Sequence, residues 1–292
     1  MPRRAGQSHD ISYASAAQSR TGRGLIRLVE NATGRRHLIR RADGYMNEIR
    51  AGADIWQVIA ARYGLSLDVV AGSVTDIPRT GPVIMISNHP FGILDGLMMG
   101  RILSLRRGTD FGIIAHDVFA QAQDLRKHIL PINFDQTALA HRENVSTRHD
   151  ALRLLAAGGA VGVFPGGTVA TAASPMGRPI DPVWRNFTAK LVLRSQATVV
   201  PVFFDGQNSR LFQIASHLHQ TLRVALLIRE FRARIDTPVR VAVGKPICQK
   251  DLRHLAHDPK ALMDFLRART YGLSPRPFPQ GDYGHEFEKR YR

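Results

Sequence analysis

The feature of this sequence that most constrains its fold is a repeated alternation of short apolar runs with segments of helical periodicity. The apolar runs are rich in β-branched residues and cover 65–70, 83–87, 111–115, 129–133, 160–164, 198–204 and 239–243. The helical segments among them cover 95–107, 117–128, 143–157, 183–195, about 210–232 and 259–271. This alternation indicates an α/β domain whose mainly parallel sheet is buried between flanking helices.

Amphipathic helices are expected before this domain. Residues 20–41 carry arginines around apolar pairs such as Leu25-Ile26, and Gly34 interrupts the pattern, which predicts a broken helix. A second helix is expected over 43–62. A basic amphipathic helix can lie in a lipid interface, or it can pack on the main domain with its arginines in solvent. The sequence leaves both arrangements open.

Four regions follow from these patterns. We expect a flexible tail over 1–18, a helical membrane-associating segment over 19–64, an α/β domain over 65–272 and a C-terminal tail over 273–292. No window approaches the ~20 apolar residues of a membrane-spanning helix, and the N-terminus lacks the apolar core of a signal peptide. The single cysteine, Cys248, excludes an internal disulfide and a cysteine-cluster metal site. We therefore expect a cytoplasmic protein in a reducing compartment.

Net charge is the unusual compositional feature. The chain has 40 Lys and Arg against 24 Asp and Glu, a formal net charge of +16. Such an excess indicates an anionic partner, which can be nucleic acid, an acidic membrane surface or an acidic carrier protein. It is also compatible with a merely basic surface. The low aromatic content and the lack of a recognised module argue against nucleic acid.

Two of the expected strands end in unusual sequence. One ends in Ser87-Asn88-His89-Pro90, with Asp95 a few residues further on, and another ends in Phe164-Pro165-Gly166-Gly167-Thr168. Ligands of α/β proteins collect beyond the carboxyl ends of the strands, and imidazole beside a carboxylate suits acid–base chemistry near neutral pH. Alternatively, Asp95 only caps a helix, and the glycines only form a tight turn.

Other chemistries lack their usual signals. The sequence has no G-x-S-x-G elbow, no G-x-x-x-x-G-K-[ST] phosphate loop and no G-x-G-x-x-G fingerprint. The pairs His217/His219 and His254/His257 have metal-ligand spacing but no further ligands nearby, so we interpret them as surface or packing residues. No metal and no cofactor are expected.

Three blocks resemble the glycerolipid (lysophosphatidate-type) acyltransferases. The stretch from Ser87 to Gly96 resembles that family's histidine–aspartate signature. Val163 to Thr168 resembles its Phe-Pro-Glu-Gly-Thr block, and Val199 to Val202 its Val-Pro-Val strand. The resemblance covers about residues 80–250, and it is strongest for the branch often labelled hemolysin-like, which includes enzymes that make ornithine lipids.

The chain departs from that family's pattern at three places. Five residues instead of four separate His89 from Asp95, and we expect Gly92 to absorb the extra residue. Gly166 stands where the family usually has glutamate, and Val169 stands where an arginine often follows the threonine. In the family these two residues help to bind the acceptor's glycerophosphate. The block 129–135 also lacks the family's arginine, and Arg142 is better interpreted as a solvated side chain than as its substitute.

The resemblance implies direct acyl transfer from an acyl carrier protein or coenzyme A thioester to a lysolipid hydroxyl. His89 would be the general base and Asp95 its partner, with backbone N–H groups near Gly166 and Gly167 or Asn88 facing the oxyanion. Lyso-ornithine lipid is favoured over lysophosphatidate as acceptor. The substrate-binding residues implied are Asn88, Phe91, Gly92, Asn133, Phe134, Phe164, Pro165, Gly166, Gly167 and Thr168.

The sequence also predicts a location for the protein and leaves two alternative functions open. We expect a peripheral protein on the anionic inner face of the cytoplasmic membrane, held by the first ~60 residues through apolar burial and charge. An acyl thioesterase that uses water as acceptor would keep His89 and discard the lipid site. A non-catalytic basic protein that binds membranes or nucleic acid would explain the charge alone.

Overall fold

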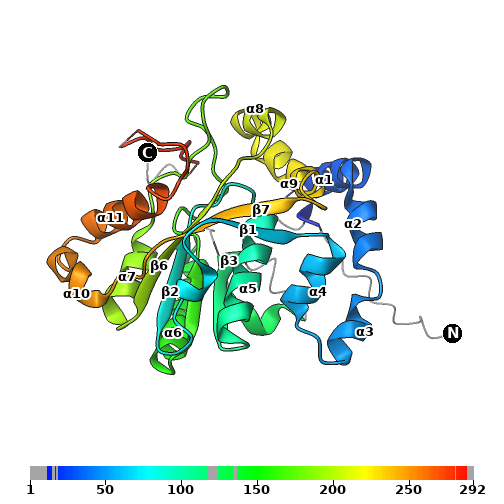
Figure 1. Ribbon diagram of the computed structural model, residues 1–292. Coiled ribbons are helices and arrows are strands. Elements are labelled where there is room, and N and C mark those ends of the chain that lie inside the picture. Colours follow the sequence, from blue (N-terminus) through cyan, green and yellow to red (C-terminus); the bar gives the residue numbers. More distant parts are fainter. Residues whose placement is uncertain are drawn as a thin grey trace.

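A computed structural model of the chain describes residues 12–14, 17, 19–116, 124–133, 137–279 and 281–287. Its centre is a seven-stranded sheet in the order β1-β7-β6-β2-β5-β3-β4 (Figure 1). The strands are β1 (Ser66–Ala71), β2 (Val83–Ser87), β3 (Phe111–His116), β4 (Ile129–Ile132), β5 (Ala160–Val163), β6 (Thr198–Phe204) and β7 (Pro238–Val243). Neighbouring strands pair in parallel except β6 and β7. The predicted α/β class with a mainly parallel sheet is confirmed.

Helices cover both faces of the sheet. Along β2, Val83 and Met85 point into one core and Ile84 and Ile86 into the other. The first core lies under α4 (Ile55–Arg62), α5 (Ile93–Arg107) and α9 (Gln220–Arg232), and the second under α6 (Ala138–Ala156), α7 (Asn186–Arg194) and α11 (Pro259–Tyr271). Because both faces are buried, the central strands need apolar residues at every position, which is why they read as uninterrupted runs.

The N-terminal helices pack on this domain. Helix α1 (Arg20–Thr33) ends at Gly34, whose φ is 147°, and α2 (Arg35–Ala42) follows, so the predicted break is confirmed. Ile26 of α1 is 1% exposed in a cluster with Ala225 of α9. Leu28 remains 67% exposed on the other side of α1. Thus α1 combines a packed apolar face with exposed leucine among its arginines.

Several predicted helices differ from those observed. The segment 43–62 forms two helices, α3 (Tyr45–Arg50) and α4, because the chain turns at Gly52 and restarts where Asp54 caps α4. The region 210–232 likewise divides into α8 (Arg210–Leu218) and α9 at His219, whose backbone is extended. Helix α6 starts earlier than predicted, since the Thr137 hydroxyl accepts the Ala140 N–H.

Two further segments differ in type. The predicted helix over 117–128 is present in its last part only as a 3₁₀ turn over Arg126–His128, and 117–123 lie outside the described residues. A short helix, α10 (Gln249–Leu252), precedes α11. Residues 281–287 of the predicted C-terminal tail run beside the connection between β5 and α7, where Gly284 N–H donates to Asp181 O (3.0 Å) and His285 N–H to Thr171 O (2.9 Å).

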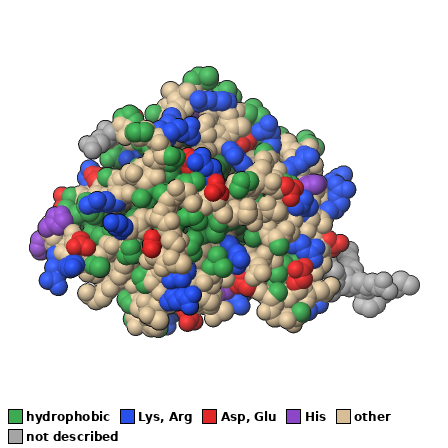
Figure 2. Space-filling view, viewed as in Figure 1, with side chains coloured by type: hydrophobic (Ala, Val, Ile, Leu, Met, Phe, Trp, Pro, Cys, Tyr) green, Lys and Arg blue, Asp and Glu red, His purple; other side chains and the backbone are tan. Residues whose placement is uncertain are grey.

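None of the helices in the described part has the length and apolar character that crossing a bilayer requires. Side chains on the surface are mixed: Figure 2 shows basic and hydrophobic groups together at the upper edge of the view, where Figure 1 places α8 and the connection between β5 and α7. Leu211, Ile214 and Leu218, at 49%, 40% and 72% exposed, form the outer face of α8.

The contact between α4 and α5 gives a stability prediction. A Cβ on Gly100 of α5 would lie 2.1 Å from Trp56 Cε3 of α4, so we expect Gly100→Ala to lower the free energy of unfolding by about 1–3 kcal/mol through overpacking. Gly96→Ala, one turn earlier on the same helix with open space around it, should instead raise it by up to about 1 kcal/mol through helix propensity. Urea denaturation measures both changes, and equal effects of the two substitutions would contradict the packing argument.

Candidate active site

A histidine and a carboxylate meet directly beyond the end of β2. His89 Nδ1 lies 2.9 Å from Asp95 Oδ2, and their side chains are 18% and 0% exposed. The same Asp95 oxygen accepts the backbone N–H groups of Phe91 (2.7 Å) and Gly92 (2.9 Å). Because this oxygen already accepts two backbone N–H groups, it is suited to accept a third hydrogen from His89 Nδ1. In that tautomer His89 Nε2 carries a lone pair.

Gly92 explains how five intervening residues bring the pair together. Its φ of 90° and ψ of −110° fall where residues other than glycine are strained. The chain turns at this point and starts α5 at Ile93, which places Asp95 in the first helical turn facing back toward the strand end. Asp95 is therefore not the N-cap that the sequence allowed, because Gly92 takes that position. From the third helical position its oxygen accepts the Gly92 N–H and also faces His89.

Other segments hold His89 in place. Phe164, at the end of β5, stacks on the imidazole with ring centroids 4.1 Å apart. The His89 N–H donates to Asp181 Oδ1 (3.1 Å), and the His89 carbonyl accepts the Ala170 N–H (2.7 Å). In the described part of the chain, nothing bonds to Nε2. The imidazole is thus held by Asp95 and Phe164 and its backbone by Asp181 and Ala170, which leaves Nε2 without a bond in the described part of the chain.

The glycine turn after β5 lies beside this histidine. Gly167 has a φ of 69°, and its N–H donates to Phe164 O (3.0 Å), so that N–H is engaged within the turn. Pro165 accepts the Arg185 N–H (2.9 Å). A Cβ on Gly166 would lie 3.2 Å from Asp181 Cβ. The Asp181 carboxyl therefore packs against the position where the related family carries a glutamate.

Thr168, the last residue of the turn, is half-buried and contacts a buried arginine. Arg223 of α9 donates to Thr168 Oγ1 (2.9 Å) and to Val169 O (2.7 Å). Val169 in turn faces the loop after β2, since a Cβ on Gly92 would lie 3.2 Å from Val169 Cγ2. The two strand ends that the sequence predicts to converge lie side by side.

The remaining predicted residues have other surroundings. The Asn88 amide is buried in the sheet, where it donates to Phe204 O (2.9 Å) and accepts from Phe204 N–H (2.8 Å), which joins the ends of β2 and β6. Phe91 is buried beneath the Arg234 guanidinium. Asn133 directly follows β4, which lies three strands from β2, or roughly 14 Å at the usual strand spacing. It bonds Glu143 and Asn144 of α6. Phe134 lies outside the described residues.

Sequence reasoning missed two charged residues of this site. Asp181 follows an irregular loop, where no periodic pattern marks it. Arg223 had a detectable signal, because it stands one turn before Leu227 on the buried face of α9. Burial raises the pKa of Asp181, although hydrogen bonds from Trp184 and His89 act in the opposite direction. Burial lowers the pKa of the Arg223 guanidinium to about 9, which leaves it protonated at neutral pH.

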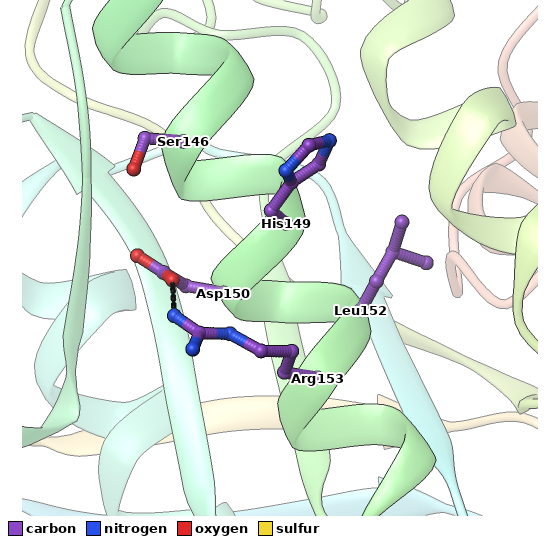
Figure 3. A pocket seen from close by; sticks show the side chains of 5 residues that line it. All are labelled: Ser146, His149, Asp150, Leu152 and Arg153. Carbon is purple, nitrogen blue, oxygen red and sulfur yellow. Dashed lines mark hydrogen bonds and ion pairs between the residues drawn. The ribbon is translucent and has the colours of Figure 1, made fainter.

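A second histidine beside an aspartate does not form such a pair. An open pocket along α6 is lined by Ser146, His149, Asp150, Leu152 and Arg153 (Figure 3). There Asp150 bonds Arg153, and His149 points away from both. Among the described residues, no group of three or more His, Cys, Asp or Glu is arranged to hold a metal ion.

Comparisons with known proteins match most of the chain. A family model described as acyltransferase matches residues 56–276. The chain is 23% identical to the lyso-glycine lipid O-acyltransferase of Phocaeicola vulgatus over 193 residues, which are 63% of this chain and 65% of that protein. It is also 23% identical to the protein of the same name from Bacteroides thetaiotaomicron over 214 residues, 70% of this chain and 74% of that protein. The chain thus spans slightly less than two thirds of the first relative's length.

One solved structure is also similar. The crystal structure of the 1-acyl-sn-glycerophosphate (LPA) acyltransferase PlsC from Thermotoga maritima matches with a TM-score of 0.44 and 14% identity. The match covers 90% of this chain and 87% of that chain.

The Gly92 turn gives a prediction for the integrity of the site. Gly92→Ala combines a strained backbone with contacts to Val169 and Leu227, so we expect it to cost about 2–4 kcal/mol of unfolding free energy. Gly81→Ala, also at positive φ but with open space around it, should cost only the backbone strain of about 1–3 kcal/mol. Denaturant unfolding measures both. A loss at Gly92 no greater than that at Gly81 would show that the contacts with Val169 and Leu227 do not matter.

Proposed function

This chain belongs to the acyltransferase family, and from that premise we propose that it transfers a fatty acyl group from a thioester to the hydroxyl group of a lysolipid. The family match confirms the resemblance to acyltransferases found in the sequence. The observation that carries the proposal is the His89–Asp95 pair, with Nδ1 held by the carboxylate and Nε2 open. A base of this kind suits an alcohol that must lose its proton during attack.

The proposed reaction is a direct displacement. His89 Nε2 takes the hydroxyl proton while the acceptor oxygen attacks the thioester carbonyl carbon, forming a C–O bond and an oxyanion. Asp95 stabilises the imidazolium that results. The C–S bond then breaks, and the imidazolium returns the proton to the leaving thiolate. We assign the oxyanion donors to the N–H groups of Gly166 and Thr168, because the Gly167 N–H already bonds Phe164.

The acceptor is proposed to be an amino-acid lysolipid. The two relatives are named for a lyso-glycine lipid, and lyso-ornithine lipid belongs to the same chemical class. Lysophosphatidate is less favoured, because Gly166 and Val169 replace the glutamate and arginine that the related family uses for glycerophosphate. The acyl donor is proposed to be acyl carrier protein or coenzyme A thioester, whose negative charge suits the net charge of +16.

Peripheral membrane association belongs to the same proposal. On α1, the exposed Leu25 and Leu28 lie among Arg20, Arg23 and Arg27, a combination that suits the boundary between headgroups and acyl chains of an anionic membrane. The buried side of α1 packs on α9.

Catalysis by His89 predicts a specific pattern of losses. His89→Ala should lower the rate of acyl transfer by about 10²–10⁴-fold, since it removes the base. Asp95→Asn should lower it by a similar factor, because an amide N–H facing Nδ1 places the imidazole proton on Nε2. His149→Ala, on the outer face of α6, should keep wild-type activity. The measurement is transfer of labelled acyl groups from acyl carrier protein thioester to a panel of lysolipids.

The products of that incubation, together with a DNA-binding measurement, distinguish the alternative functions. Label found only as free fatty acid would indicate a thioesterase. Equal rates for His89→Ala and the wild type would exclude His89 as the base. Retention of DNA at ~200 mM salt, without transfer to any lysolipid, would favour a nucleic-acid-binding protein.

The membrane proposal predicts an effect of the exposed leucines of α1. The double variant Leu25→Ser and Leu28→Ser should bind vesicles containing anionic lipid roughly tenfold more weakly, because it removes apolar surface from the interface. Leu105→Ser, which alters a leucine 49% exposed on α5, is the control and should bind like the wild type. Sedimentation with vesicles measures the binding of the double variant and of the control. Unchanged binding of the double variant would show that the exposed leucines of α1 do not contact the membrane.

A further inference from the structure

The proposed reaction gives no role to Arg223, a charged side chain beside the candidate site. Arg223 is 3% exposed on α9, and every hydrogen bond it makes in the described part of the chain goes to a neutral oxygen. It donates to Thr168 Oγ1, Val169 O, Ser216 Oγ (3.2 Å) and Thr171 Oγ1. No carboxylate among the described residues forms an ion pair with it.

Arg223 is a buried cation with no counter-ion among the described residues, as is Arg107, but Arg223 borders the candidate active site. Burial removes its hydration, and neutral acceptors restore the hydrogen bonds but not the charge. In surroundings of low dielectric constant, the uncompensated charge acts strongly on groups a few ångströms away. The position is therefore stabilised by whichever anion comes within reach.

The arginine is placed to act on the candidate active site. Its Nη2 holds Thr168, in the turn next to His89, and its own helix reaches the His89–Asp95 loop at Leu227, one turn further on. The rings of Phe287 and Phe212 also lie near the guanidinium, with centroids 4.3 Å and 5.1 Å away. Among the polar partners of Arg223, Thr168 belongs to the turn next to His89.

Thr168 can link Arg223 to a ligand through hydrogen bonds of its hydroxyl group. Its Oγ1 accepts the arginine N–H, which leaves the hydroxyl hydrogen free to donate toward the site. The rest of the turn carries no positive charge, since it consists of proline, two glycines and Val169. Among the described residues, Arg223 is the arginine whose guanidinium bonds Thr168 and Val169 of this turn.

We propose that Arg223 and Thr168 form a subsite for the anionic headgroup of the acyl acceptor. Thr168 contacts the headgroup oxygens, and Arg223 acts through it as the positioning charge. This inference rests on the proposed function and names the substrate class, a lysolipid whose headgroup carries a carboxylate or a phosphate. Glycine joined to a lipid through its nitrogen retains such a carboxylate.

Binding of three short amphiphiles tests the subsite. N-decanoylglycine carries a carboxylate, its methyl ester is uncharged, and decyl phosphate carries a phosphate. The wild type should bind the preferred anion about tenfold more tightly than the ester, the effect of one charge-assisted contact. The better of the two anions identifies the headgroup. In Arg223→Gln that ratio should fall to nearly one, with affinity for the ester unchanged.

Two further variants make the result decisive. Arg107→Gln is the matched control, because Arg107 is also buried and bonds only carbonyl oxygens, those of Pro78, Gly81 and Gly158. It should keep the wild-type ratio. Thr168→Val leaves the charge in place, removes the contacting hydroxyl and should lower the ratio about fivefold. It therefore tests the subsite even where Arg223→Gln fails to fold.

The outcomes separate this inference from the proposed function. No preference for either anion in the wild type, or a preference unchanged in Thr168→Val and in folded Arg223→Gln, would overturn the subsite. Acyl transfer to a lysolipid hydroxyl is measured on the same preparations. Transfer without an effect of these variants on the binding ratio would uphold the function and reject the subsite, whereas absence of transfer by the wild type would reject the function.

Discussion

The Asp95 carboxylate is the interaction on which the candidate site depends. One of its oxygens accepts N–H groups from His89, Phe91 and Gly92, so a single atom fixes the end of β2, the turn and the start of α5. The partial positive charge of the helix start and the two backbone donors stabilise the negative charge. That charge then sets the tautomer of His89. Without the carboxylate, the turn would lose its cap and the imidazole its orientation.

Support for His89 comes from segments far apart in the sequence. Asp181 holds its backbone N–H, Ala170 its carbonyl, and Phe164 one face of its ring. The segment 168–171 is itself held by Arg223 from α9 and by His285 from the C-terminal stretch. His89 therefore lies at a strand end that neighbouring segments hold from several directions, which is the rigid support that the proposed catalysis requires.

Residues with a local pattern were predictable from the sequence, and residues placed by tertiary contacts were not. The alternation of strands and helices gave the sheet, and Gly34 gave the break between α1 and α2 because it stops a periodic run. His89 and Asp95 were predictable as a pair since they flank one strand end. Asp181 was not, because its role comes from a loop that folds back over Gly166. The break at His219 also lacked a signal, since neither proline nor glycine marks it.

Net charge alone does not identify the partners of this protein, because its arginines have different roles in the structure. The sequence counts each arginine toward a basic surface, yet several serve as donors to backbone carbonyls inside the structure. Arg106 and Arg107 clamp the loop before β2, and Arg267 bonds Asp181 O and Asp282 O. An arginine used this way keeps its charge, but its engaged donors are not available for direct contact with a partner. The proposed membrane contact therefore uses the exposed arginines of α1, and the proposed headgroup subsite uses Arg223, which acts through Thr168.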